Sequence, residues 1–266
     1  MGKIQYYCQA KIDRPWRFDH KVKEMFTVLT IYDLNLSPMT AVGVSAEDSK
    51  SLGCCCCVDG TVYFQANIPK TGFVPGECIK VNLHLDNRSN RPMHSFEIYL
   101  LQVVSYTAAR EGIGYEHRKN ESRKISGVTE NLDEIQVPSQ YSVTRDIPIP
   151  AVVATMGNNS IVQVQYVVEC KLVPTGLSTS RKIQLPLIVG TVPLLLLPTA
   201  PLFDSGNAFP SDLPPAFSTV QPLPAEPPPP SYEECMFGRV DARNDEDNEH
   251  TRGNLAFAPK YPVYRF

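Results

Sequence analysis

The sequence predicts an all-β protein, an antiparallel β-sandwich that is followed by a disordered, proline-rich C-terminal tail. Two observations lead to the sandwich: apolar and polar residues alternate over several short stretches, and turn-forming residues separate those stretches. A third observation sets off the tail, because 11 of the 24 prolines fall in the 35 residues from Pro198 to Tyr232. Prolines remove backbone donors from any strand ladder, so a folded region that ends near residue 197 is expected.

The clearest strand is Ile79–Asp86, where apolar and polar residues alternate without a break, as in a half-buried antiparallel strand. The stretch Val162–Val168 repeats the pattern and places both of its glutamines on the outer face. Shorter stretches of the same kind are Ile4–Ile12, Thr61–Ile68, Phe96–Tyr106, Tyr141–Ile149 and Lys182–Val189. Turn residues lie between them at Val58–Gly60, Phe73–Gly76, Asn87–Asn90 and Met156–Asn159.

The stretch Arg110–Val137 is polar and rich in charge, with few apolar residues that could join a core. It is expected to hold one irregular edge strand and a mobile loop.

Charge and cysteine content exclude several classes of protein. The net charge is −3, from 25 basic and 28 acidic side chains, so no bulk attraction to nucleic acid is expected. The chain begins without an apolar signal sequence, and its longest aliphatic run, Val192–Leu197, is too short to span a bilayer. A cytoplasmic protein whose eight cysteines are reduced thiols is the expectation.

The most informative motif is the tail segment Pro227–Glu234. Consecutive prolines favour polyproline II, a conformation that aromatic-lined grooves such as those of WW domains bind. The sequence Pro229-Pro230-Ser231-Tyr232 has the PPxY form, in which the prolines stack in the groove and the tyrosine fills a neighbouring pocket. A proline-rich spacer that happens to contain a tyrosine is the alternative. An earlier stretch, Pro214–Phe217, has the form PPxF and should bind weakly or not at all, because phenylalanine lacks the hydroxyl.

Four adjacent cysteines, Cys54–Cys57, look like a metal site. Tetrahedral zinc needs thiolates that converge, whereas neighbours in an extended chain point in opposite directions. Thiols at the entry to a strand are therefore the favoured interpretation, acylation remains an alternative, and no metal or cofactor is expected.

Catalysis has little support in the sequence. The five histidines lie in no recognisable triad or metal pair, and His84 falls on the polar face of a predicted strand. The pair Gly112 and Gly114 lies in a charged stretch with no helix after it, so no phosphate loop is expected. The chain is therefore not expected to be an enzyme.

In this order, four stretches of the chain resemble the arrestin superfamily, and within it the arrestin-domain-containing proteins known as α-arrestins. Ile4–Trp16, which ends in Arg-Pro-Trp, resembles the last strand of the family's N-terminal domain. Gly72–Glu77 with Asn87–Ser89 resembles the opening hairpin of the C-terminal domain, and Leu187–Leu194 its closing strand. The tail stretches PPPPSYEE and Phe257–Tyr264 are similar to α-arrestin C-termini.

The resemblance implies three parts: a remnant last strand of an N-terminal domain at 1–20, an immunoglobulin-like C-terminal sandwich at 21–197, and a disordered acidic tail at 198–266. Most of the family's N-terminal domain would lie before residue 1, as in a shortened isoform or an incomplete gene model. The first strand is then expected to lack neighbours and to be disordered or loosely attached.

The function that the resemblance implies is that of an adaptor. Its sandwich would engage the cytoplasmic tails of membrane receptors or transporters, and its PPxY motif would recruit HECT-type ubiquitin ligases through their WW domains. Ubiquitination, endocytosis and protein transport would follow, with the adaptor located in the cytoplasm and peripherally at the plasma membrane and endosomes. The alternative is a competitor that binds the ligase but lacks cargo recognition.

Overall fold

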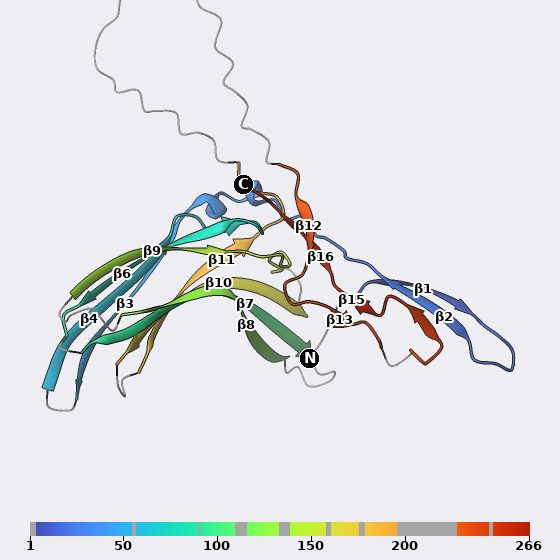
Figure 1. The fold of residues 1–266 in the computed structure, drawn as a ribbon, viewed down its shortest axis with the longest axis horizontal. Helices are drawn as coiled ribbons and strands as arrows, with labels where there is room; N and C mark the ends of the chain where they lie inside the picture. Colours follow the sequence, from blue (N-terminus) through green and yellow to red (C-terminus); the bar gives the residue numbers. More distant parts are fainter. Residues whose placement is uncertain are drawn as a thin grey trace, which may run out of the picture.

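A computed structural model describes residues 4–54, 57–89, 91–109, 116–132, 139–157, 161–175, 179–195, 228–244 and 247–266. Two sheets packed face to face form its largest part (Figure 1). One sheet has the order β3-β4-β6-β9. Its strands are β3 (Val44–Cys54), β4 (Cys57–Ile68), β6 (Cys78–Asn87) and β9 (Ser139–Pro148). The other has the order β5-β11-β10-β7-β8. Its strands are β5 (Gly72–Phe73), β11 (Arg181–Val189), β10 (Val162–Pro174), β7 (Met93–Ala109) and β8 (Glu116–Asn131).

One hydrophobic core lies between the two sheets. In β6 every second residue points into it: Ile79, Val81, Leu83 and Leu85 are buried. The facing sheet contributes alternate residues of β7 and β10, among them the buried Tyr166, whose hydroxyl donates to the Val153 carbonyl at 2.6 Å. The predicted antiparallel β-sandwich is confirmed, and the alternation that predicted it is the alternation of burial.

The polar stretch between β7 and β9 forms the long edge strand β8. Most of its side chains are exposed, yet its backbone pairs with β7 from Ser95↔Asn131 to Ala109↔Glu116, with one irregularity between Leu100 and Leu101. An edge strand needs a neighbour on one side only, so backbone pairing can hold a strand that buries little side-chain surface. The predicted edge strand is confirmed, and the adjoining residues 110–115 and 133–138 lie outside the described residues.

The chain begins with a hairpin that projects away from the sandwich (Figure 1). Strand β1 (Tyr7–Ile12) pairs antiparallel with β2 (His20–Met25). Two short 3-10 helices, η1 (Leu34–Leu36) and η2 (Pro38–Ala41), connect the hairpin to β3. The expectation that the first strand lacks neighbours is wrong, because its partner is the next stretch of the same chain. All six β1 side chains are nevertheless exposed.

The C-terminal segment from residue 228 is folded, so the expectation of disorder is wrong for this part of the tail. It contains β12 (Ser231–Glu234), β13 (Val240–Asp241), β14 (Thr251–Gly253), β15 (Ala256–Phe257) and β16 (Lys260–Val263). Strand β14 joins the hairpin by pairing parallel with β2. The proline density ends at Tyr232, and the segment beyond it supplies buried anchors: Cys235, Ala242, Ala258, Val263 and Tyr264. Residues 196–227, which include the PPxF stretch, lie outside the described residues.

No helix among the described residues has the length and apolar character that crossing a bilayer requires.

Candidate partner-binding site

The PPxY motif lies at the start of the folded C-terminal segment, partly inside strand β12. Pro229 is exposed and Pro230 half-buried, and Tyr232 is 59% exposed. The strand pairs antiparallel with β16, so that Ser231 lies opposite Val263 and Tyr232 opposite Pro262. The tyrosine side chain therefore reaches solvent, while its backbone belongs to a two-stranded ribbon.

Strand β16 is fixed to the sandwich through the residue that follows it, Tyr264. This side chain is buried against Leu34 and Val74. Its hydroxyl donates to the Thr191 carbonyl at 2.7 Å, and its backbone N–H donates to the Pro75 carbonyl at 2.9 Å. Burial raises the pKa of the Tyr264 hydroxyl, which stays a neutral donor at physiological pH.

A glycine makes this close approach to the sandwich feasible. Gly76 has a φ of +98°, and a Cβ at this position would lie 1.8 Å from the Tyr264 carbonyl oxygen. Any side chain here would displace the C-terminal strand, and the left-handed backbone would be strained as well. The turn that the sequence predicts at Phe73–Gly76 is thus also the docking place of the C-terminus.

The two residues that follow β12 are also held in place by backbone hydrogen bonds. The Cys235 N–H donates to the Pro259 carbonyl at 2.8 Å, and the Met236 N–H donates to the Ala151 carbonyl of the sandwich at 3.1 Å. Burial raises the pKa of the Cys235 thiol and that of the nearby Tyr261 hydroxyl, the latter to about 12. The PPxY motif is therefore presented by an ordered support rather than by a free tail.

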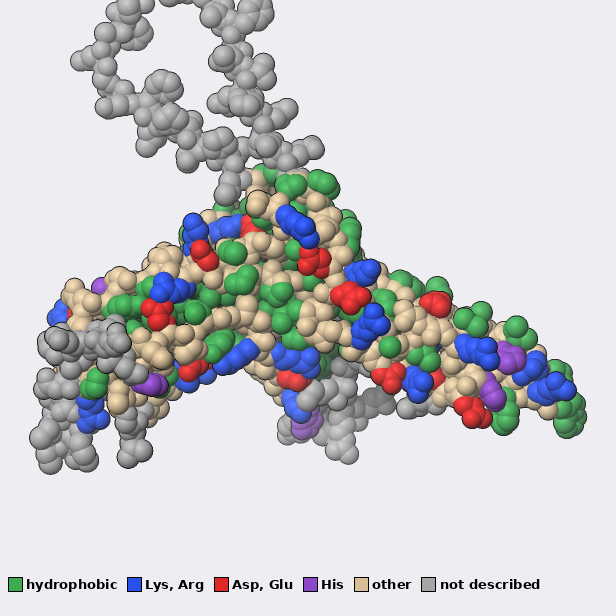
Figure 2. Space-filling view, in the orientation of Figure 1, with side chains coloured by type: hydrophobic (Ala, Val, Ile, Leu, Met, Phe, Trp, Pro, Cys, Tyr) green, Lys and Arg blue, Asp and Glu red, His purple; other side chains and the backbone are tan. Residues whose placement is uncertain are grey.

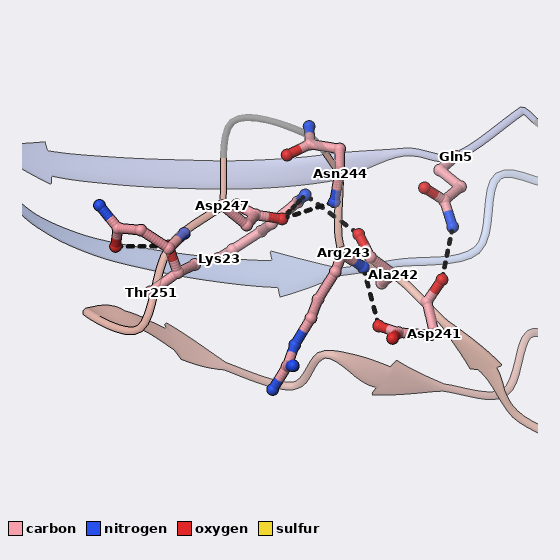
Figure 3. A network of polar contacts seen from close by, with 9 residues as sticks. Gln5, Lys23, Asp241, Ala242, Arg243, Asn244, Asp247 and Thr251 are labelled. Atoms are coloured by element: carbon pink, nitrogen blue, oxygen red, sulfur yellow. Dashed lines mark hydrogen bonds and ion pairs between the residues drawn. The ribbon is translucent and has the colours of Figure 1, made fainter.

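The same C-terminal segment holds the N-terminal hairpin through a buried ion pair (Figure 3). The Lys23 ammonium lies 2.8 Å from an Asp247 carboxylate oxygen, and the two side chains are 0% and 3% exposed. Lys23 also donates to the Ala242 carbonyl at 3.1 Å and lies over the Tyr7 ring, 4.3 Å from its centroid. Gly253, beside β2 in the sheet, leaves no room for a side chain, since a Cβ would lie 2.0 Å from the Lys23 carbonyl oxygen.

Asp247 is ionised in this pair. Burial alone would raise its pKa, but hydrogen bonds from the Lys23 ammonium and the Asn244 N–H outweigh burial and hold the pKa below its usual value. Its second carboxylate oxygen is buried without a hydrogen-bond partner among the described residues. A buried carboxylate of this kind depends on its cation.

The remaining positions that the sequence analysis considered are His84 and the cysteine cluster Cys54–Cys57. The His84 Nδ1 and the Ser142 hydroxyl lie 2.8 Å apart on the outer face of the sheet, which confirms the predicted placement of His84. The described residues contain no group of His, Cys, Asp or Glu side chains that could hold a metal ion. The side chains of Cys54–Cys57 lie outside the described residues, so the interpretation of this cluster as plain thiols stays a prediction.

Comparison with known families explains the arrangement of the sandwich and the hairpin. Residues 58–194 match the family described as arrestin (or S-antigen), C-terminal domain. The chain belongs to the arrestin family. Residues 1–35 match the N-terminal domain of the same family, so the arrestin N-terminal portion includes both strands of the hairpin and extends beyond the predicted boundary at residue 20.

Several arrestin relatives are similar to this chain at modest identity. Arrestin domain-containing protein 17 of Caenorhabditis elegans is 27% identical over 99% of this chain and 71% of its own length. Arrestin domain-containing protein 4 of Homo sapiens is 25% identical over 72% of this chain. Thioredoxin-interacting protein of Rattus norvegicus is 31% identical over 34% of this chain. The chain spans 44% of the human relative, less than half of it.

Sequence reasoning missed the ion pair, because burial in the middle of β2 is the reverse of hydropathy. Val22 is exposed while Lys23 is fully buried. The approach of Ala242 and Asp247, more than two hundred positions away, makes that face an interior one.

Proposed function

We propose that this arrestin-family chain is an adaptor that recruits WW-domain HECT-type ubiquitin ligases to the cytoplasmic tails of membrane receptors or transporters. Pro229, Pro230, Ser231 and Tyr232 form the ligase-binding site, and the sandwich binds the cargo. Recruitment promotes ubiquitination of the cargo, its endocytosis and its transport. The chain works in the cytoplasm, peripherally at the plasma membrane and endosomes, and carries out no catalysis of its own.

The exposed Tyr232 side chain, three residues after the exposed Pro229, is the observation that carries this proposal. A WW groove recognises the proline rings and the tyrosine from one side, and the groove needs access to both. Support also comes from the chemistry of the motif, since prolines have little conformational entropy to lose on binding.

Binding requires the motif to leave strand β16. A WW domain takes its ligand as polyproline II, whereas Ser231–Glu234 is held as a strand by pairing with Lys260–Val263. The two conformations exclude each other over Ser231 and Tyr232. The ligase therefore binds an opened form, and its apparent affinity is lowered in proportion to the fraction of molecules that are open.

The contact of the C-terminal segment with the rest of the molecule is compatible with such opening. A cavity of about 510 Å³ lies between the segment, the end of the hairpin and the sandwich, and Phe26, Val153 and Tyr261 are among its lining residues. Packing is therefore incomplete at this junction, and local opening costs less than it would in a filled core.

Titration of an isolated WW domain into the full chain tests the ligase arm of the proposal. For the opened motif we expect micromolar affinity, about −7 to −8 kcal/mol, with a weaker apparent affinity for the full chain, and loss of binding in Tyr232→Ala. Phe217→Ala, in the PPxF stretch, is the matched control and should bind like the wild type. Because Tyr232 joins no core, its replacement should leave the melting temperature unchanged. Equal binding by wild type and Tyr232→Ala contradicts the proposal.

A further inference from the structure

The tip of the N-terminal hairpin lies outside the PPxY motif and the sandwich, and hydrogen bonds and an ion pair order its loop. The Arg14 guanidinium donates twice to the Phe18 carbonyl, at 3.2 and 2.8 Å, which closes the loop between β1 and β2. The Arg17 N–H donates to the Arg14 carbonyl, and the Lys11 ammonium lies 2.7 Å from the Asp19 carboxylate. These contacts fix the shape of the loop and leave its apolar side chains outside.

What the loop presents to solvent is mostly apolar. Trp16 is fully exposed, and its φ of 65° makes it the sole residue other than glycine with a positive φ in the described part of the chain. Ile12 and Phe18 beside it are 64% and 69% exposed. Strained backbone that displays a large apolar side chain is typical of sites that meet a partner.

Positive charge accompanies these side chains. Residues 11–21 contain four basic side chains (Lys11, Arg14, Arg17 and Lys21) and two acidic ones (Asp13 and Asp19), a net charge of +2 in a chain whose total is −3. The end of the hairpin combines hydrophobic side chains with Lys, Arg and His side chains (Figure 2). The molecule is thus polarised, with a positive apolar end.

We propose that the tip of the hairpin, residues 11–21, docks on an anionic lipid surface and inserts Trp16 among the headgroups. Indole rings favour the boundary between hydrocarbon and water, and lysine and arginine are attracted to acidic lipids. The hairpin projects away from the sandwich, so a flat surface can meet its tip without meeting the described strands of the sandwich (Figure 1). The negative remainder of the chain turns the positive tip toward such a surface.

This contact is independent of the ligase-binding motif, which lies in β12. It would hold the adaptor against a membrane through lipid alone, with neither cargo nor ligase present. Failure of lipid binding would leave the WW interaction intact, and loss of the WW interaction would leave lipid binding intact.

The chain offers a direct reporter, because Trp16 is its only tryptophan. The full chain is mixed with vesicles of phosphatidylcholine alone, or of phosphatidylcholine with about one third phosphatidylserine. The phosphatidylserine vesicles should shift the tryptophan emission to shorter wavelength, brominated lipid should quench it, and added salt should reverse both effects. An emission spectrum that anionic vesicles leave unchanged overturns the proposal and favours a protein partner for the tip.

Vesicle flotation of variants separates the two contributions. Trp16→Ala should lower the ratio of bound to free protein about tenfold or more, and Arg17→Glu should lower it about tenfold. Leu36→Ala is the matched control, since Leu36 is 83% exposed but lies in η1 outside the hairpin, and it should float like the wild type. Flotation of Trp16→Ala equal to that of the wild type also overturns the proposal.

Discussion

Replacing Lys23 by methionine should release the C-terminal segment from the N-terminal hairpin. The substitution keeps an unbranched side chain of similar length but removes the cation. It leaves the Asp247 carboxylate with one oxygen that has lost its ion pair and another that has no hydrogen-bond partner among the described residues. Asp247 is 3% exposed, so water can reach this charge only if the segment moves.

The size of the effect follows from this burial. Removing one partner of a buried ion pair costs about 3–5 kcal/mol, because the remaining charge stays desolvated. At about 1.4 kcal/mol for each factor of ten, local opening should become about a hundredfold to several thousandfold more frequent. The increase in opening cannot exceed the free energy that holds the contact closed in the wild type, because a contact that is already open cannot be destabilised further.

Hydrogen exchange measured by mass spectrometry reads this opening in the peptides that contain β2 and β14. Faster exchange is expected there in Lys23→Met, with the sandwich strands β6 and β10 unchanged. Lys11→Met is the matched control, because its ion pair with Asp19 is open to solvent, with side chains 48% and 26% exposed, and contributes little to stability. Adding Asp247→Asn to Lys23→Met should recover much of the protection. Unchanged exchange in Lys23→Met would refute the reasoning that the ion pair holds the segment.

Three further predictions concern Tyr264, Cys170 and Asp247. Tyr264→Phe removes the hydrogen bond to the Thr191 carbonyl, which is worth about 1 kcal/mol. If β16 is released together with β12, this substitution should tighten WW binding up to about fivefold, as measured by calorimetric titration. Unchanged affinity would mean that β12 opens alone. Burial raises the pKa of Cys170 to about 12, so maleimide should label the exposed Cys8 and Cys78 in the native protein and spare Cys170 until denaturant is added. Because folding lowers the pKa of Asp247, its contribution to stability is complete above the pKa of the unfolded state, about 3.9, and is lost as the pH falls through the pKa of the folded state. Hydrogen exchange of β14, corrected for its intrinsic rate, should therefore stay constant from about pH 5 to 7 and accelerate below about pH 4.

The sandwich could be predicted from the sequence because its signal is local. From residue 79 to residue 85 each residue's polarity matches its own burial, and the register to β4 and β9 only has to keep that alternation. The edge strand β8 could also be predicted from the sequence, since a polar stretch between two clear strands can still pair along its backbone. The PPxY motif was visible for the same reason, as four adjacent residues.

The C-terminal segment could not be predicted in the same way, because its partners are distant in the chain. Tyr264 is buried only because the Gly76 turn receives it, and Lys23 only because Asp247 covers it. Averaging over a proline-rich stretch hid these few anchors and predicted disorder from residue 198 onward. The end of the proline density at Tyr232 was the one local sign that a different kind of segment begins there.

The most direct test of the adaptor account is the ubiquitination of membrane proteins in cells that lack the chain. Ubiquitin-remnant mass spectrometry of the membrane fraction is compared before and after return of the wild-type chain or of Tyr232→Ala at equal abundance. If the chain is an adaptor, its loss lowers ubiquitination of its cargo, and the wild type restores it while Tyr232→Ala does not. A rise in ubiquitination on loss of the chain, as a ligase-binding competitor would produce, would contradict the account, and so would equal restoration by Tyr232→Ala.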